Sequence, residues 1–455
     1  MNRFENLPED VRAAASRMAM PDFPAWERQV RLTGACANPI RLRGYRTVVD
    51  AGTGEVLDHY CTDDEPTGYR LVRCGNRRAV ICPSCAQVKK DDTFQIGRAG
   101  LVGGKGVPES VAEHPAIFAT LTAPSFGAVH SRHKQLGKDG KPLRCRVRRD
   151  AEPCPHGVVM SCRERHGEGD PRVGQAMCLE CYDYTGAVLF NAYAGELWKR
   201  LTIYLRREIA ARVGTSRTSL GKVAKVSFFK VAEYQARGVI HFHVVIRIDG
   251  PSGPSSAPPS WARVELLESG LRHAAAAVYV DLFSRTVRFG SQLDVQPVSQ
   301  AGDGISGPRA ALYIAKYVTK GAEIAGLPPR RIKSVDDLYW LHLPAHAERM
   351  VRECFALDLD PAHRDIAFAR WAHMLGYRGH AATKSLAYST TYGRLQQERR
   401  DHQQAERRHS QGLPPLDGRN IVIDAKWRFM RSGLAHGEAP IVDAIRARQR
   451  HFRSG

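Results

Sequence analysis

Two strand-like runs lie close together near the middle of the chain, and they restrict the fold more than any other feature of the sequence. KVSFFKVAEYQ, residues 225–235, and GVIHFHVVIRID, residues 238–249, are rich in β-branched and aromatic residues. Little more than Ala236, Arg237 and Gly238 separates them, which is the spacing of a β-hairpin. The sequence therefore predicts an antiparallel pair of strands at the centre of a sheet.

The second run of this hairpin carries two histidines on one face of the sheet. His241 and His243 are two residues apart, so both side chains leave the strand on the same side. A hairpin centred on Arg237 places Glu233 directly opposite His241, within side-chain reach. Two imidazoles and a carboxylate with open positions suit a divalent ion such as Mg²⁺ or Mn²⁺. A lone His-x-His pair also occurs as an ordinary polar sheet face.

YIAKYVTK, residues 313–320, predicts a helix with an unusual face. Pro308 suits the first turn of this helix, and Gly321 suits the position just past its end. At helical spacing one face carries two tyrosines and two lysines where leucine or isoleucine is usual. The alternative is a packing face of tyrosines with lysines that extend along it to solvent. The four residues are Tyr313, Lys316, Tyr317 and Lys320.

Tyrosines beside a metal site are suited to attack a phosphodiester. The pKa of free tyrosine is about 10, so the phenol needs activation. A divalent ion would polarise the phosphate, and a lysine would stabilise the phenolate or the charge of the transition state. The products would be a 5′-phosphotyrosine and a free 3′-hydroxyl. Because the bond energy stays in the enzyme link, a later hydroxyl can reseal the strand without a nucleotide cofactor.

Other segments predict a mixed α+β fold around the hairpin. IFATLT, residues 117–122, alternates like a central strand, and leucine or isoleucine recurs every four residues in a helix over 192–213. Residues 36–92 look loop-rich, and residues 394–411 predict a basic helix that is either solvated or bound to an acidic partner. The expected regions are an amino-terminal region over 1–112, a catalytic region over 113–325 with a zinc-binding insertion at about 130–185, and a basic, mostly helical region over 326–455.

The eleven cysteines are clustered, and two CxxC pairs indicate structural zinc. Reduced free thiols are the alternative interpretation. The zinc ligands could also include Cys61, Cys145 or His156 as replacements. The two CxxC pairs could instead form one zinc ribbon. The preferred sets are Cys36, Cys74, Cys82 and Cys85, and then Cys154, Cys162, Cys178 and Cys181.

The chain is strongly basic, which favours a polyanionic partner. Lys plus Arg total 67 against 47 for Asp plus Glu, giving a formal net charge of +20. Nucleic acid is the first candidate, although a merely basic protein would show the same balance. No secretory signal or membrane-spanning stretch is recognisable, so we expect a cytoplasmic protein without a membrane partner.

The histidine pair, the tyrosine helix and their order resemble those of the HUH endonucleases. IFATLTAPS, residues 117–125, looks like the first motif of their replication initiators, and the doubled tyrosine resembles the gene A proteins of isometric single-stranded DNA phages. Closer still, the sequence is similar to replication initiators of actinobacterial plasmids and integrative conjugative elements. That similarity rests on CGNRRAVICPSC, CLECYDYTGAVLFNAYAGELWKRLT, VAEYQARGVIHFH and RWAHMLGYRGH, and runs from about Cys36 to Arg394.

This resemblance implies a five-stranded antiparallel sheet with flanking helices, with the first motif on a central strand and the histidines on its neighbour. It implies metal ligation by His241 and His243, attack by Tyr317 or Tyr313, and rolling-circle replication from a nicked bacterial origin. The partners would be double- and single-stranded origin DNA, a polymerase and a single-strand-binding protein. No GxxxxGK[ST] loop occurs, so unwinding would need a host helicase. A transposase or relaxase of the same fold and a non-cutting zinc-dependent regulator are the competing hypotheses.

Overall fold

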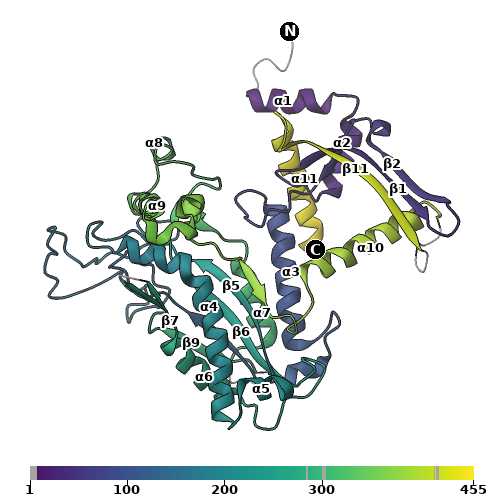
Figure 1. Ribbon diagram of the computed structural model, residues 1–455. Coiled ribbons are helices and arrows are strands. Elements are labelled where there is room, and N and C mark those ends of the chain that lie inside the picture. Colours follow the sequence, from purple (N-terminus) through teal and green to yellow (C-terminus); the bar gives the residue numbers. More distant parts are fainter. Residues whose placement is uncertain (1–7, 283–284, 300–303, 414–415, 417–419, 455) are drawn as a thin grey trace. The chain divides into compact units, whose positions relative to one another are not determined.

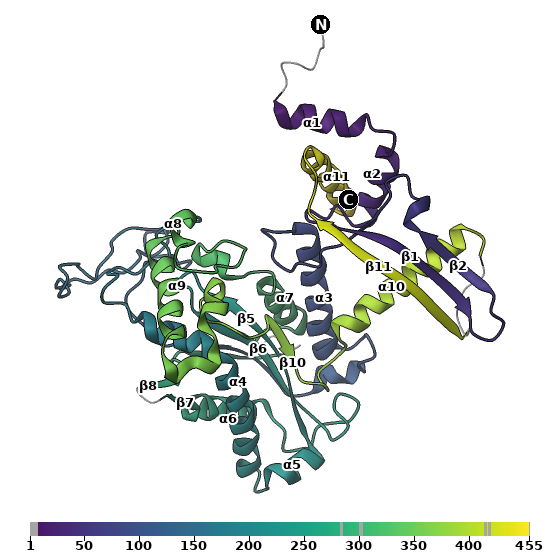
Figure 2. The same cartoon turned by 45° about the horizontal axis from the view of Figure 1, so that its top comes forward.

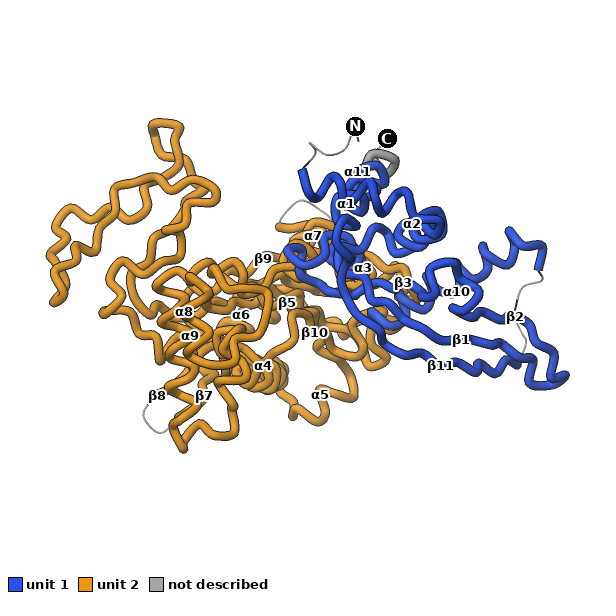
Figure 3. The backbone as a smooth tube through the Cα atoms, turned by 90° about the horizontal axis from the view of Figure 1, so that it is seen from above, with its two compact units in different colours: residues 1–92, 391–455 blue, residues 93–390 orange. Residues whose placement is uncertain are grey.

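The computed structural model describes residues 8–282, 285–299, 304–413, 416 and 420–454. The chain forms two compact units, Met1–Asp92 with Thr391–Gly455, and Thr93–Thr390 (Figure 3). These boundaries differ from the three regions expected over 1–112, 113–325 and 326–455, because the carboxyl-terminal segment returns to the sheet that the amino-terminal segment begins. Helix α3, Pro83–Val102, runs from the first unit into the second.

The first unit is built on an antiparallel sheet with the strand order β11-β1-β2 and with β3 paired to β1. Strand β1 pairs with β11 from Ile40 opposite Ser432 to Asp50 opposite Ile421. The prediction of a loop-rich segment over 36–92 was therefore wrong, and the mostly helical region over 326–455 also contains strands. The elements are α1 (Glu9–Met18), α2 (Phe23–Leu32), β1 (Ile40–Asp50), β2 (Val56–Cys61), β3 (Arg70–Val72), α10 (Tyr392–Ser410), β11 (Ile421–Ser432) and α11 (Glu438–Ser454), with a 3₁₀ turn at Thr62–Asp64.

A small apolar core joins the two sequence segments of the first unit. Trp26 of α2 is fully buried and packs in one cluster with Val442 and Ile445 of α11. Beside it, Arg41 of β1 donates to Glu438 at 2.6 Å, and both side chains are nearly inaccessible to solvent. The segments thus form one folded body, although residues 93–390 separate them in the sequence.

The second unit contains a five-stranded sheet in the order β10-β5-β6-β4-β9, and all its neighbouring strands are antiparallel. The predicted hairpin register is confirmed, since Glu233 of β5 lies opposite His241 of β6. The predicted strand over 117–122 is β4, which lies between β6 and β9 and places Thr120 opposite His243. The α+β class predicted from the sequence is confirmed as a mixed fold with antiparallel sheets.

Alternate side chains of this sheet enter two different layers. Phe242 and Val244 of β6 belong to a large apolar core shared with α4 and α6, which cover one face of the sheet (Figure 1). His243 and Arg247 point to the opposite face, where α7 packs on β5 and β6 (Figure 2). The polar site therefore lies on the face away from the main core.

The second unit contains the long helix that the sequence predicted, together with several shorter helices. The helix predicted over 192–213 is α4, which begins earlier, where Asp183 accepts a capping hydrogen bond of 2.9 Å from the Gly186 amide. The elements are β4 (Ala116–Leu121), α4 (Tyr184–Arg212), α5 (Arg217–Val223), β5 (Lys225–Tyr234), β6 (Ile240–Asp249), α6 (Val264–Ala277), β7 (Tyr279–Leu282), β8 (Arg285–Arg288), β9 (Leu293–Pro297), α7 (Gly307–Tyr317), α8 (Leu338–Leu341), α9 (Ala345–Asp358) and β10 (Ala382–Lys384), with 3₁₀ helices at Glu109–Glu113, Ala322–Ala325, Pro361–Ile366 and Phe368–Met374. Among the described residues, no helix has the length and apolar character needed to cross a membrane.

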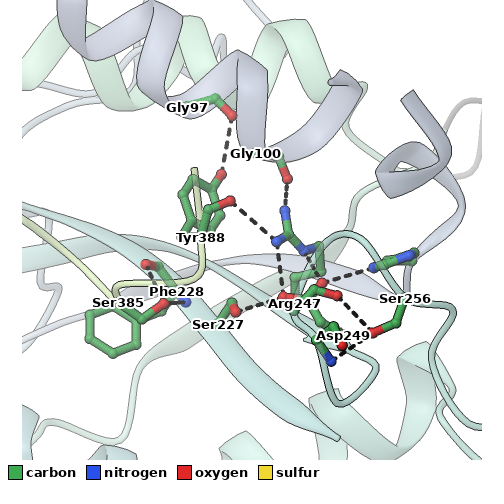
Figure 4. A network of polar contacts seen from close by, with 12 residues as sticks. Gly97, Gly100, Ser227, Phe228, Arg247, Asp249, Ser256, Ser385 and Tyr388 are labelled. Carbon is green, nitrogen blue, oxygen red and sulfur yellow. Dashed lines mark hydrogen bonds and ion pairs between the residues drawn. The ribbon is translucent and has the colours of Figure 1, made fainter. Parts of the chain in front are cut away.

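A buried ion pair ties the end of β6 to α3 and to the segment after β10 (Figure 4). Arg247 and Asp249 are both fully buried, and they are joined by contacts of 2.5 and 2.9 Å. Arg247 also donates to the carbonyl oxygens of Gly100 and Tyr388. Burial alone would raise the pKa of Asp249, but hydrogen bonds from His114 and Arg247 outweigh it and hold that pKa below its usual value. The carboxylate is therefore charged at neutral pH.

The substitution Asp249→Asn should destabilise the second unit strongly. It leaves the Arg247 guanidinium buried without its counter-ion, which lowers the free energy of unfolding by about 3–5 kcal/mol. Urea unfolding followed by circular dichroism measures this loss. A matched variant, Asp249→Asn combined with Arg247→Met, carries no buried charge and should lose less. A single variant as stable as the unsubstituted chain would contradict the structural role of this pair.

Candidate active site

The β5–β6 hairpin brings a carboxylate and two imidazoles to one point. The Nε2 atom of His241 lies 2.7 Å from Oε2 of Glu233, and the Nε2 atom of His243 lies 2.8 Å from the same oxygen. His243 and Glu233 are buried, and His241 is partly exposed. The structure thus brings together the three residues that the hairpin pattern singled out.

Helix α7 places both tyrosines against this cluster. The Tyr317 ring stacks on the His243 ring with 4.5 Å between centroids and an interplanar angle of 17°. Tyr313 lies edge-on to His243 at 5.3 Å and to Tyr317 at 5.1 Å. Elsewhere around α7, Ile314 and Ala315 are fully buried. The helix therefore presents its tyrosines to the histidines of β6, while its apolar residues pack away from solvent.

The two predicted lysines take different positions. Lys320 Nζ lies 2.9 Å from Oε1 of Glu233 and 4.7 Å from the Tyr317 ring centroid. Lys316 Nζ is 5.6 Å from that centroid. The expected helix up to Gly321 was too long, because α7 ends at Tyr317 and the Lys320 amide then donates to the Tyr317 carbonyl in a turn. Lys320 therefore reaches the site from this turn and not from the helix face.

Burial and charge set the protonation of the cluster. Burial would raise the pKa of Glu233, but hydrogen bonds from His241 and His243 and a further one from Lys320 hold it well below its usual value. Burial lowers the pKa of His243 despite the opposing effect of Glu233. Burial, Tyr313 and the Glu233 charge together raise the pKa of Tyr317. At neutral pH the carboxylate is ionised, while Tyr317 keeps its proton.

The cluster fits a divalent cation. The candidate ligand atoms of Glu233, His241 and His243 all lie within 4.8 Å of one another. One carboxylate oxygen and two imidazole nitrogens leave coordination positions open for water or phosphate. Such a ligand set suits Mg²⁺ or Mn²⁺. Thr120 Oγ1 lies 3.1 Å from Nδ1 of His243, a contact of the kind that orients a metal-bound imidazole. Thr120 was not among the predicted site residues, although its place on the strand beside His243 could have revealed it.

The first predicted cysteine set comes together in the first unit. Cys36, Cys74, Cys82 and Cys85 have their sulfur atoms within 4.8 Å of one another. The Sγ atoms of Cys82 and Cys85 lie 3.6 and 3.7 Å from that of Cys36. Four cysteines at this spacing match the closed tetrahedral geometry of structural zinc.

The second predicted set needs a correction. Cys154, Cys178 and Cys181 come together with His156, while Cys162 joins another group of possible ligands. A β-bridge pairs Cys162 with Arg146, which draws Cys162 toward Cys145. The sequence had offered His156 and Cys145 as replacements, but it missed His130 and His166. The Cys162-x₃-His166 spacing, which is common among zinc ligands, could have revealed the second of these histidines.

Comparison with known proteins identifies the family of this chain. A family model described as "Replication initiator protein, pSAM2" (RepSA) matches residues 22–447. A replication initiator protein of Streptomyces ambofaciens is 44% identical over 437 residues, which cover 93% of this chain and 90% of that protein. No solved structure matches the chain. Because the family match spans both units and every candidate ligand described above, the chain belongs to the replication initiator protein family.

Proposed function

We propose that this protein starts rolling-circle replication by cutting one strand at an origin through a covalent 5′-phosphotyrosine. The cut leaves a 3′-hydroxyl primer, and the same residues rejoin the strand at termination. The observation that carries this proposal is the stacking of the Tyr317 ring on His243 at 4.5 Å, beside Glu233 and His241. A tyrosine that only packed in an apolar core would have no reason to lie against a candidate metal ligand.

The fold supports the same proposal. The HUH resemblance implies a five-stranded antiparallel sheet in which the first motif neighbours the histidine strand, and β4 lies beside β6 in a sheet of this kind. The net charge of +20 suits a DNA partner. A replication initiator acts on origin DNA. After the proposed cut, a host helicase would unwind the duplex, a polymerase would extend the 3′-hydroxyl and a single-strand-binding protein would cover the displaced strand.

Each side chain has a distinct part in the proposed reaction. Glu233, His241 and His243 would hold Mg²⁺ or Mn²⁺, which supplies charge stabilisation on the scissile phosphate. Lys320, whose ammonium lies 4.7 Å from the Tyr317 ring centroid, would stabilise negative charge as the phenol attacks. The raised pKa of Tyr317 means that its phenol is protonated before the attack. As its oxygen bonds to phosphorus, the P–O3′ bond would break, the phenol would lose its proton to solvent and the leaving 3′-oxygen would take up a proton.

The two tyrosines differ in their access to DNA. Tyr313 is 40% exposed, whereas Tyr317 is 7% exposed. An incoming strand would therefore meet the Tyr313 side chain more readily, while the Tyr317 ring lies closer to the His243 ring. Two phenols one helical turn apart would allow one to stay linked to DNA while the other cuts again.

The proposal is tested with supercoiled DNA that carries the cognate origin. Incubation of the purified full chain with this DNA and Mn²⁺, followed by denaturing electrophoresis, should yield nicked circles with protein attached to the 5′ end. The same DNA with a scrambled origin, or with EDTA added, should remain intact. Origin binding without any nick would favour the non-cutting regulator. Transposases and relaxases share this chemistry and would instead process the ends or transfer origin of a different element.

A further inference from the structure

The segment between β4 and α4 is folded without any regular element. Residues 122–183, all of which the structure describes, contain turns and isolated bridges but no helix or strand. Its buried side chains include Cys145, Cys162, His166 and Cys178. A segment of this length with so few buried apolar side chains needs another source of stability, such as bound metal.

One group of polar side chains in this segment has the composition of a closed metal site. The Nδ1 atom of His130 lies 3.2 Å from Nε2 of His166 and 3.8 Å from Sγ of Cys145. The Sγ atom of Cys162 lies 3.7 Å from Nε2 of His166. All four ligand atoms are within 4.8 Å of one another. We call these four residues the first tetrad.

These separations are those of ligands around a tetrahedral zinc ion. With bonds of about 2.3 Å to sulfur and about 2.0–2.1 Å to nitrogen, tetrahedral geometry puts two nitrogens about 3.3 Å apart and a nitrogen and a sulfur about 3.6 Å apart. The observed 3.2, 3.7 and 3.8 Å agree to within a few tenths of an ångström. Two thiolates and two imidazoles with no open position select zinc over magnesium or manganese.

Neighbouring residues form hydrogen bonds with the first tetrad of the kind that metal ligands usually have. Asp170 Oδ2 lies 2.8 Å from Nδ1 of His166, which fixes the ring so that Nε2 faces the other ligands. Such a carboxylate behind a histidine is a usual partner of zinc-bound imidazole. The Ser131 amide donates to Cys145 Sγ at 3.2 Å, which stabilises a thiolate there. The His166 side chain is fully inaccessible to solvent.

The first tetrad is interleaved in sequence with the corrected cysteine set, here called the second tetrad. Along the chain the ligands come in pairs, and the pairs belong alternately to the first and to the second tetrad. In the second tetrad, Nδ1 of His156 lies 3.3 Å from Sγ of Cys181 and 3.7 Å from Sγ of Cys178. The order is His130, Cys145, Cys154, His156, Cys162, His166, Cys178 and Cys181.

We propose that the first tetrad binds a structural zinc ion and that it forms, with a second zinc ion in the second tetrad, an interleaved two-zinc module over residues 130–181. Each ion closes a loop that contains ligands of the other, so the loss of one ion frees the chain that positions its neighbour. The module adjoins the hairpin that carries the histidines, because a Cβ atom on Gly174 would lie 2.3 Å from the backbone of Ala236. This proposal stands independently of the nicking chemistry.

Zinc content of the full chain tests the proposal. Elemental analysis of purified protein should give three zinc ions per chain, one of them from the Cys36 set. A variant with Cys145→Ser and Cys162→Ser should hold two or fewer, and its second tetrad should release zinc to a chromogenic chelator at least about tenfold faster than in the unsubstituted chain. The matched control, Cys82→Ser with Cys85→Ser, should lose one ion and leave release from the module unchanged.

A conservative replacement separates ligand loss from misfolding. Because His130 faces the group with Nδ1, the ring nitrogen nearer the backbone, a cysteine sulfur at this position reaches nearly the same point. We expect His130→Cys to keep three zinc ions and His130→Ala to lose at least one. Two zinc ions in the unsubstituted chain, iron in place of zinc, or full zinc in His130→Ala would overturn the first tetrad as a zinc site. Unchanged chelator release from the second tetrad after loss of the first would overturn the interleaved module.

Discussion

A chain that carries both Tyr313→Phe and Tyr317→Phe is expected to form no covalent adduct with origin DNA. Phenylalanine preserves the ring at position 317 that stacks on His243 and the ring at position 313 that lies edge-on to Phe118. It removes the two hydroxyls that are proposed to attack phosphorus. Removal of a catalytic nucleophile costs on the order of 10³-fold or more in rate. Quantitative denaturing electrophoresis of nicked product measures this loss.

The single variants Tyr313→Phe and Tyr317→Phe test which step each phenol performs. Each retains one nucleophile, so each should still cut, while the second transfer that releases a closed circle should be lost. Tyr339→Phe is a matched control, because Tyr339 is 72% exposed and lies outside the cluster. Adduct formation by the double variant at the unsubstituted rate would show that the nucleophile lies elsewhere in the chain.

Replacement of both histidines by alanine is expected to separate binding from cutting. His241→Ala with His243→Ala removes two of the three residues whose donor atoms converge, and Glu233 alone cannot hold the ion at a fixed position. Cleavage should fall on the order of 10³-fold, since the phosphate loses its charge stabilisation. Origin affinity, measured by fluorescence anisotropy in EDTA, should change by less than about threefold, because many basic residues contribute to it.

A histidine outside the cluster controls for the loss of imidazole as such. His273 on α6 is exposed, and its ring lies 3.6 Å from Glu208, in a contact unrelated to the site. His273→Ala should cut origin DNA at the unsubstituted rate. If the double histidine variant lost origin affinity but kept its cleavage rate on bound DNA, the histidines would be DNA contacts and not metal ligands.

Local geometry explains why the hairpin could be predicted closely. The short connection at Ala236–Gly238 fixes the register, and the register alone places Glu233 opposite His241. Helical periodicity likewise put Tyr313 and Tyr317 on one face, although it could not show that α7 ends at Tyr317 and that Lys320 returns to Glu233 through a turn. These residues are near one another in sequence, so local rules apply to them.

Features that depend on distant parts of the chain could not be derived in this way. Strand β11 pairs with β1 across nearly the whole sequence, and Gly44 permits this pairing because a Cβ atom there would lie 1.9 Å from the Lys426 carbonyl oxygen. The alternation in IVIDAKWRFMRS, residues 421–432, could have indicated a strand but not its partner. The predicted grouping of the second ligand set was also wrong. Cys162 is closer in sequence to Cys154 than to Cys145, yet its β-bridge with Arg146 brings it to the group that contains Cys145.

Mass spectrometry of the protein–DNA adduct tests the central claim most directly. The chain is incubated with origin DNA and Mn²⁺, the DNA is trimmed with nucleases, and the tryptic peptides are sequenced. We predict a nucleotide attached through its 5′-phosphate to the phenolic oxygen of Tyr317 or Tyr313. An adduct on any other residue, or nicked origin DNA whose 5′ ends carry no peptide, would contradict the proposed attack.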